Sequence, residues 1–593
     1  MPARSNAGSS FHFSTHDLLA VLVLLATASM FTLDRLDQGV QIPFVTGDAG
    51  VYASQAAAML WPENFESDPL LRLGWSMTPA WMVLFFPVTI GLFKILGDFQ
   101  IAFTAPVLPL VFLQGLGFYL LGRSVFGSRY KALLFSLACY LPVDGTYWYV
   151  QKLAMGRMWY SAYYPFLILL FLRFAPNPRH WPWLMMAAGA GMYVHPVSTP
   201  VVGFAVYAGL LAFRPSDWSW PRTITYMVLC GLAFVLAALP FIIANLAVTV
   251  DSTIFDYDGF LRARSWSGNA FISVGHYVQH IFSQVNVLAL LSCGIAGGWV
   301  AWRLREGESR HLAFMTYCTV GLLFASILIP WVEIETVKRL EMRPQLDEAV
   351  RSIRYVMPNA VYFILAGLLA AMHRLKLADG GIARIWRDKV IMSGAAATVF
   401  VGLYGASVQI SPTPPYVFAW YQFVPFLQTL QCWKRGHFRC PLPSVDEITP
   451  VIDHLRQNYP SKVRVLPFLD RHIGLQVSQA SVAAIIRYSA RLPVAFSFHE
   501  ELLPFYGRLD KDAYLWRYMD YRQQYFVSYH DFEYVTPRPL PTLEKLVQDL
   551  APDVLVTDLR LMAWQEVALG LVTFRTDTVT VIDLRDSARK RNP

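Results

Sequence analysis

The chain has 593 residues, of which 55% are hydrophobic and 15% charged, and its formal net charge is +8. Soluble domains carry about one quarter charged residues, so this composition excludes an ordinary soluble enzyme and indicates a multi-span membrane protein. The positive charge needs no nucleic-acid partner, because cytoplasmic loops of membrane proteins concentrate Lys and Arg.

The first apolar stretch, 18–33, is predicted to be an uncleaved first span, with a cleaved signal peptide as the alternative. The following loop, 34–75, holds six acidic residues against two basic ones, so the positive-inside rule places it outside. Within it, VTGDAGVYASQAAAML at 45–60 has an Asp in a Gly-rich turn before a short predicted helix. Residues spaced by three and four share one face of that helix: Asp48, Tyr52, Gln55 and Met59.

The apolar segment 77–97 is interrupted by Pro79 and Pro87. We predict that it is a re-entrant or interfacial helix, because this choice places the basic loop 122–131 inside. The remaining apolar segments then give about 11 transmembrane helices: 18–33, 101–121, 131–149, 160–174, two in 181–213 with a turn at 195–196, 223–249, 284–302, 312–331, 355–372 and 390–410.

The part of the chain after 440 is predicted to be a soluble domain outside the membrane. The aromatic stretch 416–430 is short for a span and is predicted to be interfacial; if it crosses, the last domain becomes cytoplasmic. In the part of the chain after 440, predicted helices alternate with predicted strands, which is typical of a small α/β domain. The predicted helices are 444–459 and 543–550, and the predicted strands are 462–469, 493–498, 553–559, 571–575 and 579–583.

We therefore expect a polytopic α-helical transmembrane domain at 1–440, with the outer-loop helices at 34–97, and a soluble α/β domain at 441–593. No residue of the soluble domain stands out for chemistry, so we expect it to cover the site or to dock a partner. Cys432 and Cys440 lie outside the apolar segments. They suggest a disulfide if the region faces an oxidising compartment, or else a free pair.

Asp48 is the first candidate for catalysis. A carboxylate on an outward loop beside the membrane has access to lipid and water, and transfer from a lipid phosphate needs a base for the acceptor. The alternative is that Asp48 caps the helix that follows. His195 would lie at the outer end of its hairpin, where it binds a phosphate or hydroxyl or is a turn residue.

Two further groups of outward residues are candidates for binding. His276 and His280, which follow Asp256 and Asp258, are four residues apart. This spacing suits a pair of ligands for a divalent metal ion, and the alternative is a polar interfacial turn. A basic group after the 312–331 span suits phosphate binding or a salt-bridge network on a surface helix. Its members are Lys338, Arg339, Arg343, Arg351 and Arg354, and Arg262 and Arg264 are second choices for phosphate.

The chain resembles the GT-C superfamily of polyprenyl-phosphate-sugar-dependent membrane glycosyltransferases, which includes protein O-mannosyltransferases and aminoarabinose transferases. The resemblance covers roughly 18–410. It lies in GDAGVY at 47–52, the proline-broken helix after it, and LGRSVFGSRYKALLFSLACYLP at 121–142. By this similarity Asp48 matches the first-loop acid, although the family motif is often Asp–Glu and Ala49 follows here.

The resemblance implies a lipid-linked sugar donor, and family members hold the lipid phosphate with Arg or Lys. We expect transfer to a glycan, lipid or protein in the cell envelope, in a bacterial inner or plasma membrane. A non-catalytic component that binds a lipid-linked glycan and recruits a protein partner is the alternative. A transporter ranks third, because no internal repeat and few charges inside spans are found.

Overall fold

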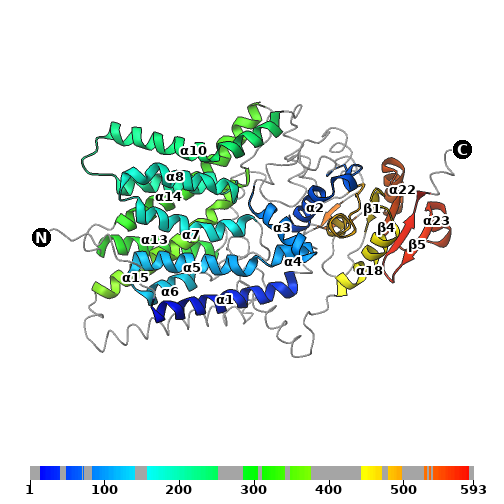
Figure 1. The fold of residues 1–593 in the computed structure, drawn as a ribbon, viewed down its shortest axis with the longest axis horizontal. Helices are drawn as coiled ribbons and strands as arrows, with labels where there is room; N and C mark the ends of the chain where they lie inside the picture. Colours follow the sequence, from blue (N-terminus) through cyan, green and yellow to red (C-terminus); the bar gives the residue numbers. More distant parts are fainter. Residues whose placement is uncertain are drawn as a thin grey trace.

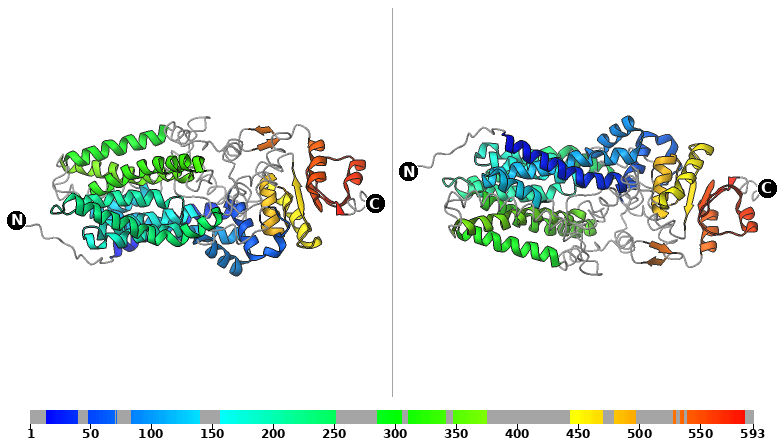
Figure 2. Two further views of the ribbon diagram at one scale, coloured as in Figure 1. Left: turned by 90° about the horizontal axis from the view of Figure 1, so that it is seen from above. Right: turned by 90° about the horizontal axis from the view of Figure 1, so that it is seen from below.

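The computed structural model describes most of the chain. The described residues are 14–39, 48–69, 71, 83–139, 156–250, 285–304, 310–340, 347–374, 443–469, 479–496, 527–529, 533–535 and 539–585. A bundle of long helices lies at one end of the molecule and a small sheet domain at the other (Figure 1). Three short helices within residues 48–104 lie between the bundle and the sheet domain, as the views in Figure 2 also show.

The bundle is built from apolar helices whose positions follow the hydropathy of the sequence. They are α1 (Thr15–Gly39), α5 (Val107–Phe126), α6 (Arg129–Ala138), α7 (Gly156–Phe174), α8 (Trp181–Ala190), α9 (Thr199–Gly209), α10 (Trp220–Val250), α13 (Val285–Leu304), α14 (Arg310–Leu340) and α15 (Val356–Arg374). Among the described residues, four helical stretches are long and apolar enough to cross a membrane: Ile101–Phe126, Trp220–Ala244, Arg310–Thr336 and Ala349–His373. The chain is an integral membrane protein, and the count of 11 spans stays a prediction.

The segment predicted to be non-spanning forms α3 (Phe85–Leu96), a helix of 12 residues. At 1.5 Å per residue it is about 18 Å long, which is too short for a hydrocarbon core of about 30 Å. Gly97 ends it with a φ of +73°, a left-handed conformation that a Cβ would strain. The expectation that 77–97 does not cross the membrane stays a prediction.

Close helix packing in the bundle depends on small residues, as is usual in membranes. α13 and α15 approach so closely that a Cβ on Gly367 would lie 2.4 Å from the Gly297 carbonyl oxygen. The hairpin predicted in 181–213 is present as α8, the 3-10 turn η5 (Gly191–Tyr193) and α9. The predicted outer loop after residue 331 is instead largely helical, because α14 continues to Leu340 and the 3-10 helix η7 covers Asp347–Tyr355.

The first predicted loop forms α2 (Asp48–Leu60) and the 3-10 turn η1 (Pro62–Phe65). With α3 and α4 (Phe99–Thr104) it packs on the C-terminal domain, and these parts share one hydrophobic core that is distinct from the core of the bundle. Three alanines of α2, Ala53, Ala56 and Ala57, have no exposed surface in that core. The loop is therefore a folded layer between bundle and domain.

The C-terminal domain has a four-stranded mixed sheet in the order β1-β4-β6-β5, in which β1 and β4 are parallel and the other pairs antiparallel. Its elements are α18 (Pro443–Asn458), β1 (Val465–Phe468), α19 (Gln479–Ile485), the π-helical turn η9 (Ile486–Ala490), β2 (Val527–Tyr529), β3 (Glu533–Val535), α22 (Pro539–Leu550), β4 (Val554–Thr557), α23 (Ala563–Leu569), β5 (Leu571–Arg575) and β6 (Thr580–Asp583). The strand expected at 493–498 is wrong as stated for the described residues, since only Val494 bridges to β1.

Candidate functional site

A polar cluster lies where the η5–α9 turn meets η7. His195 Nδ1 lies 2.9 Å from Ser198 Oγ and accepts the Ser198 backbone N–H at 3.3 Å. Ser352 Oγ in turn donates to Ser198 Oγ at 3.3 Å. Because Nδ1 accepts these hydrogen bonds, the neutral His195 ring carries its proton on Nε2.

Two guanidinium groups from different elements approach the same region. Tyr355, at the end of η7, has no exposed surface and interacts with the side chains of Ser198 and Ser161. Arg157 near the start of α7 and Arg354 in η7 both act electrostatically on it. Arg354 is 4% exposed, and its Nε donates to the Arg351 carbonyl at 2.8 Å. We call His195, Ser198, Ser352, Tyr355, Arg157 and Arg354 the His195 cluster.

Hydrogen bonds continue from this cluster into the bundle. The Tyr164 hydroxyl donates to Asn359 Oδ1 at 3.0 Å, and Asn359 Nδ2 donates to Thr319 Oγ1 at 2.9 Å. These three residues lie on α7, α15 and α14, so the network ties together the helices around η7. Polar groups in an apolar bundle are stable only when they are paired, which makes such a network rigid.

The first-loop layer contacts this cluster through aromatic side chains. The Tyr52 ring of α2 lies 5.3 Å from the Phe85 ring, centroid to centroid. A Cβ on Gly156 would lie 3.5 Å from Phe85 and 3.2 Å from the His195 ring, so both side chains pack closely against this glycine. Leu84 N–H also donates to the Tyr193 carbonyl at 2.6 Å. Tyr52, His195 and Arg354, predicted from three separate segments, thus belong to one region.

The other predicted site residues are placed differently. Asp48 is the first residue of α2, but its side chain is outside the described part of the structure. Arg351 lies half-buried in η7, whereas Arg339 is exposed near the end of α14. Arg262, Arg264, Arg343, Asp256, Asp258, His276, His280, Cys432 and Cys440 lie outside the described residues. Within the described ranges, no three His, Cys, Asp or Glu residues are grouped so that they could hold a metal ion.

Sequence reasoning missed the hydroxyl residues and Arg157. Ser198 lies three residues after His195 in HPVST, a spacing that a helix start brings together, and this was the one local signal available. Ser352 and Tyr355 are far from His195 in sequence, so no local pattern indicates their contact.

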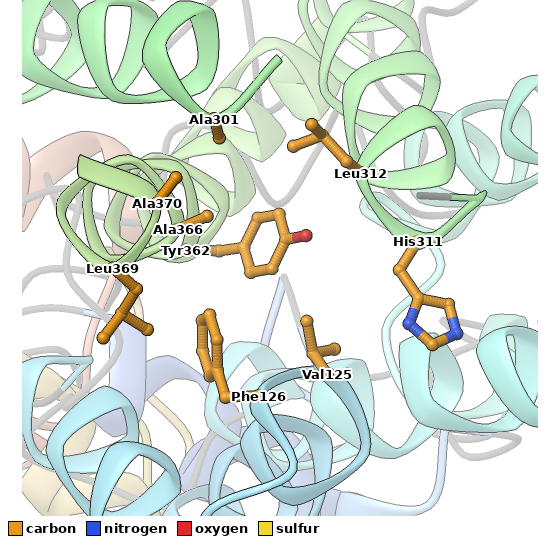
Figure 3. A pocket seen from close by; sticks show the side chains of 9 residues that line it. All are labelled: Val125, Phe126, Ala301, His311, Leu312, Tyr362, Ala366, Leu369 and Ala370. Carbon is orange, nitrogen blue, oxygen red and sulfur yellow. The ribbon is translucent and has the colours of Figure 1, made fainter. Parts of the chain in front are cut away.

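A separate cavity of about 210 Å³ lies between the ends of α5, α13, α14 and α15 that face away from η7 (Figure 3). It is lined by Val125, Phe126, Ala301, His311, Leu312, Tyr362, Ala366, Leu369 and Ala370. The Tyr362 hydroxyl points into it toward α14, and most of the other lining side chains are apolar. None of the described residues that line it is an Arg or Lys, so the His195 cluster suits an anionic ligand better.

Comparisons with protein-family models and with curated proteins gave no match. Among solved structures, the chain is similar to ArnT from Cupriavidus metallidurans bound to undecaprenyl phosphate, at 13% identity and a TM-score of 0.45, over 95% of this chain and 97% of that one. The apo state of the same protein is similar at 15% identity and a TM-score of 0.46, with the same coverage.

An oligosaccharyltransferase from Archaeoglobus fulgidus, in complex with Zn and sulfate, is similar at 13% identity and a TM-score of 0.41, over 90% of this chain and 68% of that one. Likeness at identities and TM-scores this low determines neither the fold nor any residue role of this chain.

Proposed function

We propose that this chain is a membrane glycosyltransferase that moves a sugar from a polyprenyl-phosphate donor to a glycan, lipid or protein acceptor on the outer membrane face. The observation that supports this is that Arg157 and Arg354, from different elements, both act electrostatically on the buried Tyr355 at the end of the bundle next to α2. Guanidinium groups suit phosphate, which they bind with two parallel hydrogen bonds. A lipid-linked phosphate reaches such a site from the membrane.

The proposed reaction assigns a role to each side of the site. The acceptor oxygen attacks the anomeric carbon while the Asp48 carboxylate takes its proton. The bond between that carbon and the phosphate oxygen breaks, and polyprenyl phosphate leaves with the electron pair. Arg157 and Arg354, with Arg351 of η7 as a further candidate, stabilise the charge that develops on the leaving phosphate. Tyr52 and His195 would contact the sugar or the acceptor between them.

The test uses the full chain in lipid nanodiscs, with polyprenyl phosphate for binding and a panel of polyprenyl-phosphate sugars for transfer. Asp48→Asn should lower transfer by about 10²–10⁴-fold and leave polyprenyl-phosphate binding intact. Arg354→Met should weaken both sugar transfer and polyprenyl-phosphate binding. Glu63→Gln is the matched control for Asp48, because Glu63 is an exposed acid of the same loop. Normal transfer by Asp48→Asn would remove Asp48 from the mechanism, and a wild-type chain that binds no polyprenyl phosphate would overturn the proposal.

One observation favours the non-catalytic alternative, in which the chain recruits a protein partner. Around α23 and β5, on the side of the C-terminal domain away from the bundle, four large apolar side chains are at least 62% exposed (Figure 1): Met562, Trp564, Val567 and Leu571. Under this alternative, Trp564→Ser abolishes function in cells while Asp48→Asn has no effect. Deleting 441–593 does not separate the two functions, because the deletion also removes the support of α2.

A further inference from the structure

A buried carboxylate after η1 joins the first-loop layer to the C-terminal domain. Asp68 Oδ2 accepts Arg487 Nε at 2.7 Å, and Asp68 Oδ1 accepts Arg487 Nη2 at 3.1 Å. The Val494 N–H donates to Oδ2 at 2.9 Å and the Leu71 N–H to Oδ1 at 3.1 Å. Neither side chain of the pair has exposed surface. Three of these four donors belong to the C-terminal domain.

Because this pair is buried, the position of the first-loop layer against the C-terminal domain depends on it. A charge without its partner in an apolar interior is strongly unfavourable, whereas a bidentate pair with further hydrogen bonds is stable. If the domain moved away from the loop, Asp68 would lose the three donors that Arg487 and Val494 supply, whereas the Leu71 N–H lies in its own segment. The position of the first-loop layer therefore depends on Arg487, which lies 419 residues later in the chain.

Aromatic contacts around the pair hold the same two parts together. The Arg491 guanidinium lies 4.0 Å from the centroid of the Trp61 ring, and Arg491 adopts a φ of 59°, which is unusual for a non-glycine residue. Phe99 of α4 packs edge-on against Tyr488 of η9, with centroids 6.3 Å apart. The left-handed Arg491 ends η9, with its backbone N–H donating to the Ile486 carbonyl, and its side chain extends from this cap over the Trp61 ring.

The layer that Asp68 fixes carries the proposed reacting residues. α2 packs on α19 and η9 in the shared core, and its first turn holds Asp48 and Tyr52. Tyr52 contacts Phe85, and Phe85 lies beside Gly156 and His195. A shift of α2 would therefore move the proposed base relative to the His195 cluster, while the cluster itself is built by other helices.

We propose that Arg487 is a positioning residue for sugar transfer: by binding Asp68 it fixes α2, and with it Asp48, against the membrane site. This inference rests on the proposed function and extends it, because it makes the C-terminal domain part of the reaction's scaffold. A misplacement of a reacting group by about 1 Å costs about 100-fold in rate, so loss of the pair acts on turnover. Binding of the lipid phosphate at the His195 cluster stays unchanged.

The experiment compares Arg487→Met and Arg487→Lys with Lys462→Met in the full chain in nanodiscs, below the unfolding temperature of each variant. Lys462 pairs with Glu66 at 3.2 Å across the same interface, but both side chains are more than half exposed, so it is the matched control. Hydrogen–deuterium exchange of 48–60, polyprenyl-phosphate binding and transfer from polyprenyl-phosphate sugars are measured for each.

Arg487→Met should raise exchange across α2 and lower kcat by about 100-fold, with polyprenyl-phosphate binding unchanged. Arg487→Lys, which keeps the charge and one donor, should recover part of the turnover, and Lys462→Met should match the wild type. Equal α2 exchange in Arg487→Met and Lys462→Met would overturn the inference, and so would normal turnover in both Arg487 variants. If the wild type neither binds the lipid nor transfers sugar, the proposed function fails, while the exchange arm still decides whether Arg487 fixes α2.

Discussion

Two buried carboxylates, at opposite ends of the helical bundle, are stabilised in different ways. Asp17, at the start of α1, accepts the Tyr119 hydroxyl at 2.7 Å and the Ser14 hydroxyl at 2.8 Å, and it pairs with Arg123 and Arg129. Its arginine partners keep 17% and 38% of their side-chain surface exposed. Asp68 pairs with an arginine that is fully buried.

The difference shows which end of the molecule depends on distant parts of the chain. The arginine partners of Asp17 belong to the basic segment 122–131, so its ion pairs are completed within the first quarter of the chain, and water still reaches these two arginines. The Asp68 partner comes from the last quarter, in a dry interface. Water can compensate for a lost partner at the first end and cannot at the second.

The largest effect on stability is expected for the fully buried Asp68–Arg487 pair. Arg487→Met should lower the free energy of unfolding by about 3–5 kcal/mol, because it leaves the Asp68 charge buried without its partner. The double variant Asp68→Leu/Arg487→Met should recover part of this loss, although two backbone N–H donors then stay unpaired. Heat-induced unfolding of the full chain, analysed as a double-mutant cycle, measures both. A double variant that is no more stable than Arg487→Met would contradict the assignment.

A smaller effect on stability is expected for Asp17, whose arginine partners are partly exposed. Asp17→Asn should cost about 1–3 kcal/mol, because an amide keeps a hydrogen bond to Tyr119 but loses the charge that attracts Arg123 and Arg129. The same unfolding assay measures it, and polyprenyl-phosphate binding should stay at the wild-type level. A loss of unfolding free energy as large as that of Arg487→Met would show that both ion pairs are equally shielded from water. This result would contradict the comparison.

The smallest effect concerns pH and the C-terminal domain. Burial lowers the pKa of His454 on α18 below its usual 6.5, and its ring stacks on Phe574 with centroids 4.6 Å apart. The unfolded chain then binds this proton at a higher pH than the folded one, so stability falls as pH drops below about 6.5. His454→Phe should remove this part of the acid slope between about pH 7.5 and about pH 5.5. An unchanged slope in the unfolding temperature would refute it.

Local patterns predicted much of the framework. The apolar segments mark the helices of the bundle, the interrupted segment 77–97 contains the short α3, and short strand-like apolar runs mark β1, β4, β5 and β6. Hydropathy and prolines act over a few residues, so these features need no tertiary information. For the charged segment after residue 331, a surface helix is one of two alternatives, and the structure has helix in α14 up to Leu340 and in η7.

The sequence by itself determined that the chain is a membrane protein whose first loop is rich in acidic residues, and the soluble character of its C-terminal part stays a prediction. Only the tertiary structure decided that Asp68 binds Arg487 and that Ser352 meets Ser198, 154 residues earlier. A carboxylate or hydroxyl in a sequence does not indicate its partner. The partner is selected when burial removes water and only the correctly placed donor can replace it.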